Sequence, residues 1–147
     1  MTDSLQKAIN DLVPKSLDDI VRVNRDRYSL RLFSENDMAS FVPMVESMTE
    51  HKPVRGIIDD WRIICLQVVD QKLYFLTGIL RERRVSYMTS DVRSVDIENN
   101  LVLTKNSLYE IGSKGEGEPD FHGLLHICAV FHAWGTGPYL GAPHIFY

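Results

Sequence analysis

The chain has 147 residues, a length typical of one domain, and its 44% hydrophobic and 24% charged residues argue against a disordered or fibrous protein. Sixteen basic against twenty acidic residues give a net charge of -4, which disfavours the broad positive field that attracts nucleic acid. The N-terminus lacks the apolar region of a secretory signal and no stretch reaches the roughly 18 apolar residues of a membrane span, so we expect a cytoplasmic protein with no membrane partner.

Helical patterns dominate the first part of the chain, up to about residue 53. Apolar residues recur at helical spacing in three segments, which are 5–13, 17–23 and 38–48. Ser16 and Ser34 each stand three residues before an aspartate, as in a capping box, and Pro43 interrupts the third segment. An alternating run at 28–33 predicts an edge strand between the helices.

Short runs of strand-forming residues, separated by turn residues, fill positions 61 to 111. Such a pattern is typical of an antiparallel meander of five or six strands. The predicted strands are 61–69, 72–80, 85–89, 92–97, 101–104 and 107–111. The first two are almost continuously apolar, which predicts that both faces of the sheet are covered there. Short paired strands of this kind curl readily, so we expect a half-open barrel.

A last helix and an apolar tail follow, over about 119–147. Asp120 is a suitable N-cap and Gly135 a suitable residue to end the helix. The tail from Pro138 to Tyr147 has no charged side chain, so we expect it to dock rather than fray. The sequence therefore predicts an α+β fold in a single domain, 1–147, with N-terminal helices, a curled meander and one C-terminal helix plus its tail.

Candidate catalytic groups are sparse. Cys65 and Cys128 lie among apolar neighbours with no base nearby, as expected of buried free thiols in a reducing compartment. His122 and His126 are four residues apart on the predicted last helix and could form half of a metal site, which leaves a metal-dependent enzyme as one alternative. A third ligand is not evident, so we assign no metal, no cofactor and no catalytic residue.

With no coherent reactive set, the sequence favours a non-enzymatic module that binds another protein, such as a small inhibitor or antagonist of the immunity or anti-defence type. Association with a second copy of the chain also remains open. Partner-binding anchors are expected among aromatic and arginine residues near predicted turns. The candidates are Tyr74, Arg83, Arg84, Tyr87, Trp134 and Tyr139.

A second alternative is a small β-barrel that binds single-stranded nucleic acid. Curled sheets with basic loops and exposed aromatic residues bind single strands in this way. The basic residues available are Arg81, Arg83, Arg84, Arg93 and Lys105. The acidic net charge counts against this alternative without removing it.

Overall fold

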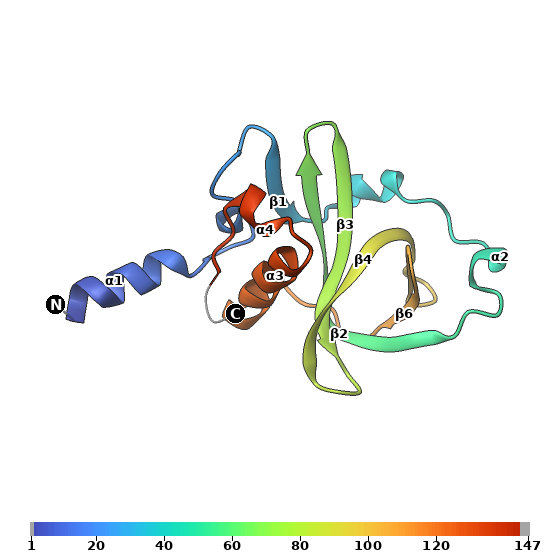
Figure 1. Ribbon diagram of the computed structural model, residues 1–147. Helices are drawn as coiled ribbons and strands as arrows, with labels where there is room; N and C mark the ends of the chain where they lie inside the picture. The colour runs from blue at the N-terminus through green and yellow to red at the C-terminus, as the bar shows by residue number, and fades with distance from the viewer. Residues whose placement is uncertain (1, 145–147) are drawn as a thin grey trace.

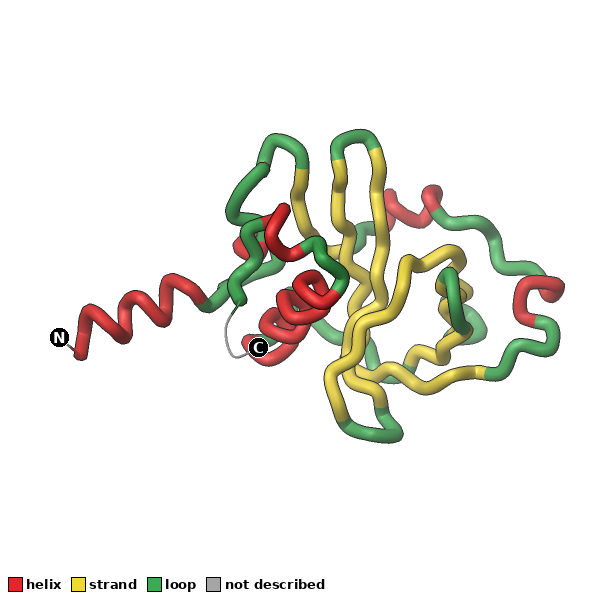
Figure 2. The backbone as a smooth tube through the Cα atoms, viewed as in Figure 1, coloured by secondary structure: helices red, strands yellow, loops and turns green. Residues whose placement is uncertain are grey.

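A computed structural model describes residues 2–144 of the chain. The strands are β1 (Tyr28–Leu32), β2 (Val54–Val68), β3 (Gln71–Leu80), β4 (Val85–Asp96), β5 (Leu101–Thr104) and β6 (Leu108–Ile111). The helical segments are α1 (Thr2–Leu12), the 3-10 turns η1 (Asp18–Ile20) and η2 (Glu35–Ser40), α2 (Glu46–Thr49), α3 (Phe121–Ala133) and α4 (Gly137–Leu140). Figures 1 and 2 show α3 and α4 beside one side of the sheet, while the later strands curl away on the other. The predicted α+β class is confirmed.

The six strands are hydrogen-bonded in sequence order, and every consecutive pair is antiparallel. One further pairing joins β2 to β6 in parallel, with Val54 opposite Leu108 and Ile58 opposite Ile111. The pairings from β2 to β6 therefore form a ring, although the sheet is not a true barrel. This arrangement confirms the predicted curled meander and adds the parallel pairing, which local patterns could not reveal.

A bend in β2 allows this one strand to serve two neighbours. Its first half pairs with β6 and its second half with the edge strand β1, which confirms the strand predicted at 28–33. At the bend, Asp60 has a positive φ of 50°, and the register with β3 shifts between Asp59 and Arg62. An irregularity of this kind turns a strand sharply and increases its local twist.

Two strand boundaries differ from the prediction. Strand β2 begins at Val54, seven residues before the predicted start at Trp61, because its first half is defined by its pairing with distant β6. The predicted strands 85–89 and 92–97 form one strand, β4. Its register with β3 shifts between Phe75 and Thr77, so an irregularity inside one strand produces the apparent break.

The helices predicted over 38–48 and 17–23 form only in part, as short helical segments. The first segment contains only η2 and the single turn α2, and the second contains only η1. Between η2 and α2, the Val42 N–H donates to the Arg93 carbonyl and the Val42 carbonyl accepts from the Ser94 hydroxyl. These bonds to β4 hold the segment against the sheet, while Pro43 removes the next backbone donor.

The sheet separates two hydrophobic clusters, which confirms that the central strands are covered on both faces. One lies between the sheet and the helical side and includes Ile64, Phe75, Leu124, Ile127 and Phe131. The other lies within the ring of strands and includes Ile58, Trp61, Leu76, Val102 and Tyr109.

Helix α1 forms as predicted but points away from the rest of the molecule (Figure 1). Its apolar residues Leu5, Ile9 and Leu12 are all exposed, so helical spacing did not imply burial here. None of the helices within residues 2–144 has both the length and the apolar character needed to cross a membrane.

The tail is docked over its described part. The Leu140 carbonyl accepts hydrogen bonds from the backbone N–H groups of Arg22 and Val23, at 2.7 and 3.1 Å, and Leu140 itself is buried. The predicted ends of α3 are also confirmed, because Asp120 accepts from the Gly123 N–H and Gly135 follows the helix with a φ of 80°. The prediction for Ile145, Phe146 and Tyr147 lies outside the described residues.

Candidate functional site

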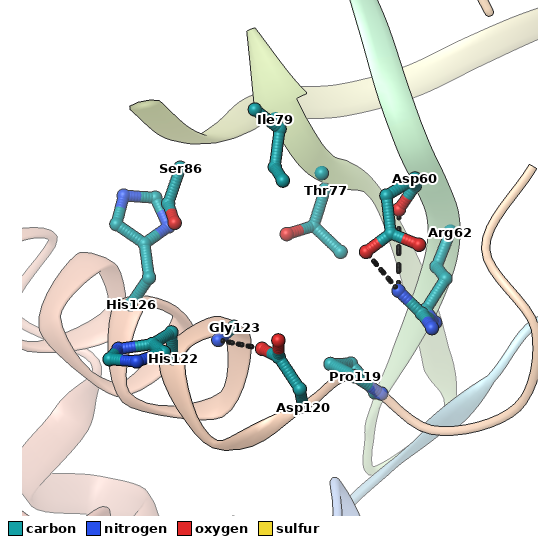
Figure 3. A pocket seen from close by; sticks show the side chains of 11 residues that line it. Asp60, Arg62, Thr77, Ile79, Ser86, Pro119, Asp120, His122, Gly123 and His126 are labelled. Carbon is teal, nitrogen blue, oxygen red and sulfur yellow. Dashed lines mark hydrogen bonds and ion pairs between the residues drawn. The ribbon is translucent and has the colours of Figure 1, made fainter. Parts of the chain in front are cut away.

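A polar pocket of about 190 Å³ lies between the start of α3 and strands β2, β3 and β4 (Figure 3). His126 and Ser86 lie at one end of this pocket, and Asp60 and Arg62 at the other. The remaining lining residues are Thr77, Gly78, Ile79, Pro119, Asp120, His122 and Gly123. The bend in β2 and the capped start of α3 together create this polar pocket.

His126 is the chemically unusual member of the polar pocket. Its Nδ1 atom is buried and has no hydrogen-bond partner among the described residues. Burial lowers the pKa of His126, so the ring is neutral at pH 7 and retains one acceptor nitrogen. Ser86 forms no hydrogen bond with it, so the two residues are not a nucleophile and base pair in this structure.

The metal alternative lacks ligands within the described part of the chain. His122 and His126 do line the same pocket, as their spacing on α3 predicts. No group of three histidine, cysteine, aspartate or glutamate residues that could hold a metal ion is found within residues 2–144. The acidic residues of the pocket have other partners, since Asp60 pairs with Arg62 and Asp120 caps α3.

Arg62 is fixed by backbone and side-chain acceptors. Its guanidinium donates to the Gly117 carbonyl at 2.7 Å and the Glu116 carbonyl at 2.9 Å, and to the Asp60 carboxylate at 3.1 Å. These bonds tie the loop after β6 to the bend of β2. Arg62 therefore has a structural role and little capacity left for a ligand.

A larger, mostly apolar pocket of about 480 Å³ lies between the end of β1, η2, the bend of β2 and the loop after β6. It is lined by Leu32, Phe33, Glu35, Met38, Trp61, Arg62, Ile63, Ile97, Lys114, Gly115 and Gly117. Its inner wall, Trp61 and Ile63, belongs to the cluster inside the ring of strands. We call it the ring pocket.

The rim of the ring pocket combines exposed apolar groups with a cation. Met38 is 40% exposed and Ile97 52% exposed. The Lys114 ammonium lies 5.7 Å from the centre of the Trp61 ring, a cation–π distance. Apolar walls with a few charged groups at the rim are typical of binding sites.

The structure places the predicted aromatic anchors in different environments. Tyr74 is 4% exposed, and its hydroxyl forms hydrogen bonds with Asp37 and Ser40 of η2. The prediction that Tyr74 is a surface anchor is therefore wrong, because the local sequence did not show that η2 covers it. Trp134 is partly exposed and packs on Phe75 with ring centres 5.2 Å apart. Tyr139 is 62% exposed on α4.

The predicted basic residues do not form one continuous patch. Arg81 donates two hydrogen bonds to Asp59, at 2.7 and 2.8 Å, and Arg93 pairs with Asp91 at 3.2 Å. Arg84 and Lys105 are exposed. Arg83 and Tyr87, in contrast, line one pocket together.

The ring pocket was missed by sequence reasoning. Phe33, Met38, Trp61, Ile97 and Lys114 come from five separate segments of the chain. Each apolar member resembles an ordinary core residue in its own segment. The available local signal was Trp61 directly after the Asp59-Asp60 doublet, which marks the bend but not the pocket.

Comparisons with known proteins add no assignment. No protein-family model, curated protein or solved structure matches the chain.

Proposed function

We propose that the protein is a binding module that takes an apolar side chain of a partner protein into the ring pocket. The observation that carries the proposal is the combination of a 480 Å³ apolar pocket with Met38 and Ile97 exposed at its rim. Binding energy at protein interfaces concentrates in anchors that fill such pockets. Methionine adapts its shape to an incoming group at little cost.

The charge at the rim indicates the chemistry of the anchor's neighbours. Arg62 is already satisfied by its four acceptors, and Lys114 is the remaining cation of the pocket. Glu35 lies in the same lining and repels acidic groups on its side. A partner segment with an aromatic or aliphatic residue and an acidic residue on the Lys114 side fits best.

An inhibitor or antagonist is one form that such a module takes, and the buried free thiols Cys65 and Cys128 support a cytoplasmic setting. The nucleic-acid alternative has weaker support. Of the five basic residues in that alternative, Arg81 and Arg93 form ion pairs with carboxylates, which reduces the positive field of the surface.

Selection from a displayed peptide library tests the proposal. The wild-type protein should enrich peptides with an apolar anchor and a nearby acidic residue. Met38→Asp and Ile97→Asp should each bind these peptides about tenfold more weakly or worse, because each variant places a charge at the apolar rim. Val45→Asp is the matched control, since Val45 is also exposed but outside the pocket.

Two results would count against the proposal. One is a selection in which the wild-type protein enriches no consensus. The other is a consensus that the Met38 and Ile97 variants retain as well as the Val45 control does.

A further inference from the structure

A third pocket, of about 190 Å³, lies where the start of β2, the β3–β4 turn and β6 meet. Its lining residues are Arg55, Leu80, Glu82, Arg83, Tyr87 and Tyr109. It shares no residue with the ring pocket. We call it the Arg–Tyr pocket, and its function is independent of the proposed function.

The two guanidinium groups of this pocket have no carboxylate partner in the described part of the chain. None of the ion pairs within residues 2–144 involves Arg55 or Arg83. Arg55 has one long hydrogen bond, of 3.4 Å, to the Ser107 hydroxyl. Glu82, the acidic member of the lining, accepts a 3.0 Å hydrogen bond from the Ile57 backbone N–H. The lining therefore has a net positive charge of one, in a protein that is negative overall.

The two tyrosines supply a further donor. Their hydroxyl oxygens are 3.0 Å apart, so one hydroxyl donates to the other, and the accepting hydroxyl keeps its own proton for another partner. Burial, together with the bond to Tyr87, raises the pKa of Tyr109 to about 12. Tyr109 therefore keeps its proton at neutral pH, despite the two arginines nearby, and the pair leaves one hydroxyl proton for a ligand.

These groups suit a ligand with several anionic oxygens. A carboxylate has two oxygens and one charge, and a single guanidinium can satisfy both oxygens in a bidentate pair. Two guanidiniums and a hydroxyl offer more donors than that. A phosphate monoester has three terminal oxygens and a charge of about -1.5 to -2 at pH 7. Its three oxygens match two guanidiniums and one hydroxyl, and its charge is attracted by the net positive charge that remains after the Glu82 carboxylate is counted.

We propose that the Arg–Tyr pocket binds a phosphate monoester. The group could belong to a phosphorylated side chain or to a small phosphorylated molecule, since both present the same three oxygens. The acidic net charge of the protein opposes long polyanions, so a single phosphate group is a better match than a nucleic-acid backbone.

Titration followed by two-dimensional NMR tests this proposal, with inorganic phosphate, phosphoserine, adenosine monophosphate and acetate as probes. The side-chain Nε–H signals of Arg55 and Arg83 should shift and saturate with phosphate, with a Kd on the order of 1 mM. Acetate should bind at least about tenfold more weakly, because it offers fewer acceptors and less charge.

Three variants locate the site. Arg83→Gln should weaken phosphate binding by about tenfold, and Tyr87→Phe by several-fold through loss of a hydroxyl. Arg84→Gln is the matched control, because Arg84 stands in the same turn but outside the lining, and it should bind as wild type does. The dispersion of the amide spectrum shows whether Arg83→Gln alters the fold. If it does, the proposal is tested by comparing the phosphate affinity of Tyr87→Phe with that of Arg84→Gln.

The outcomes separate clearly. Tighter binding of phosphoserine than of inorganic phosphate supports the proposal with a phosphorylated side chain as the source, and tighter binding of adenosine monophosphate supports it with a small molecule as the source. Acetate binding as tight as phosphate, no saturable shift, or equal loss in Arg83→Gln and Arg84→Gln overturns it. Met38→Asp should leave phosphate binding unchanged, so this proposal and the proposed function fail independently.

Discussion

The Asp37 carboxylate and the Arg31 guanidinium form two hydrogen bonds of 2.8 and 2.9 Å where β1 leads into η2. Asp37 is 3% exposed and also accepts bonds from the Ser34 N–H and the Tyr74 hydroxyl. One carboxylate thus joins β1, η2 and β3. The ring pocket depends on this junction, because Met38 follows directly after Asp37.

We expect Asp37→Asn to destabilise the protein by about 2 kcal/mol, because hydrogen bonds to a buried charge are replaced by weaker neutral ones. Urea unfolding measures the change. Asp18→Asn is the control, since Asp18 also makes two bonds to one arginine, Arg25, but in an exposed pair. The control substitution should lower the free energy of unfolding by less than about 1 kcal/mol. Equal losses would show that the burial of Asp37 adds nothing.

Stability should fall as the pH drops from about 7 to 5 because of His126. Burial lowers the pKa of His126 in the folded protein, whereas the unfolded chain titrates near 6.5. In this range the unfolded state binds more protons, so the contribution of the neutral ring is complete above about pH 6.5 and is lost below it.

His126→Asn should flatten this pH dependence, as measured by urea unfolding at several pH values. His51→Asn, at an exposed position, is the control variant. Aspartates in the unfolded chain titrate near pH 3.9, so Asp37 affects stability mainly below this range. A slope that the His126 variant shares with wild type would contradict the prediction.

Both thiols should be inert in the folded protein. Cys65 lies in the cluster inside the ring and Cys128 in the cluster under α3, and both are fully buried. Burial also raises the pKa of Cys128 to about 12, so little thiolate exists near neutral pH. A thiol reagent should label neither cysteine in buffer and both in urea. Fast labelling in buffer would mean that a cluster opens readily.

Gly141, in the tail, should be sensitive to substitution by alanine. Its φ is 65°, and a Cβ there would lie 2.9 Å from a methyl carbon of Val23. Gly117 has a similar φ of 66° with nothing near its missing Cβ, so it serves as the matched control. Gly117→Ala should cost about 1 kcal/mol from backbone strain alone.

Gly141→Ala should cost at least about 1 kcal/mol more than this control, because the clash is added to the same strain. It should also speed hydrogen exchange at the Arg22 and Val23 amides, which donate to Leu140. Equal effects in the two variants would show that the tail moves away from Val23 without loss.

The sequence by itself determined the elements whose signals are local. Alternation and turn residues located most of the meander, and the caps Asp120 and Gly135 located α3, because hydrogen bonds and backbone preferences of nearby residues decide these features. The helix predicted at 38–48 is interrupted where Val42 forms hydrogen bonds with a distant strand, β4, which the local pattern could not show.

Tertiary structure alone decided the ring and the candidate sites. The β2–β6 pairing joins residues about fifty positions apart, and no local pattern encodes such a contact. It also decided that Arg81 pairs with Asp59 while Arg83 has no carboxylate partner within residues 2–144, although both arginines stand beside the same turn. The sequence gives the charge and the apolar character of each side chain. Which of those groups are already satisfied, and which are left to bind something else, depends on the neighbours that folding brings to them.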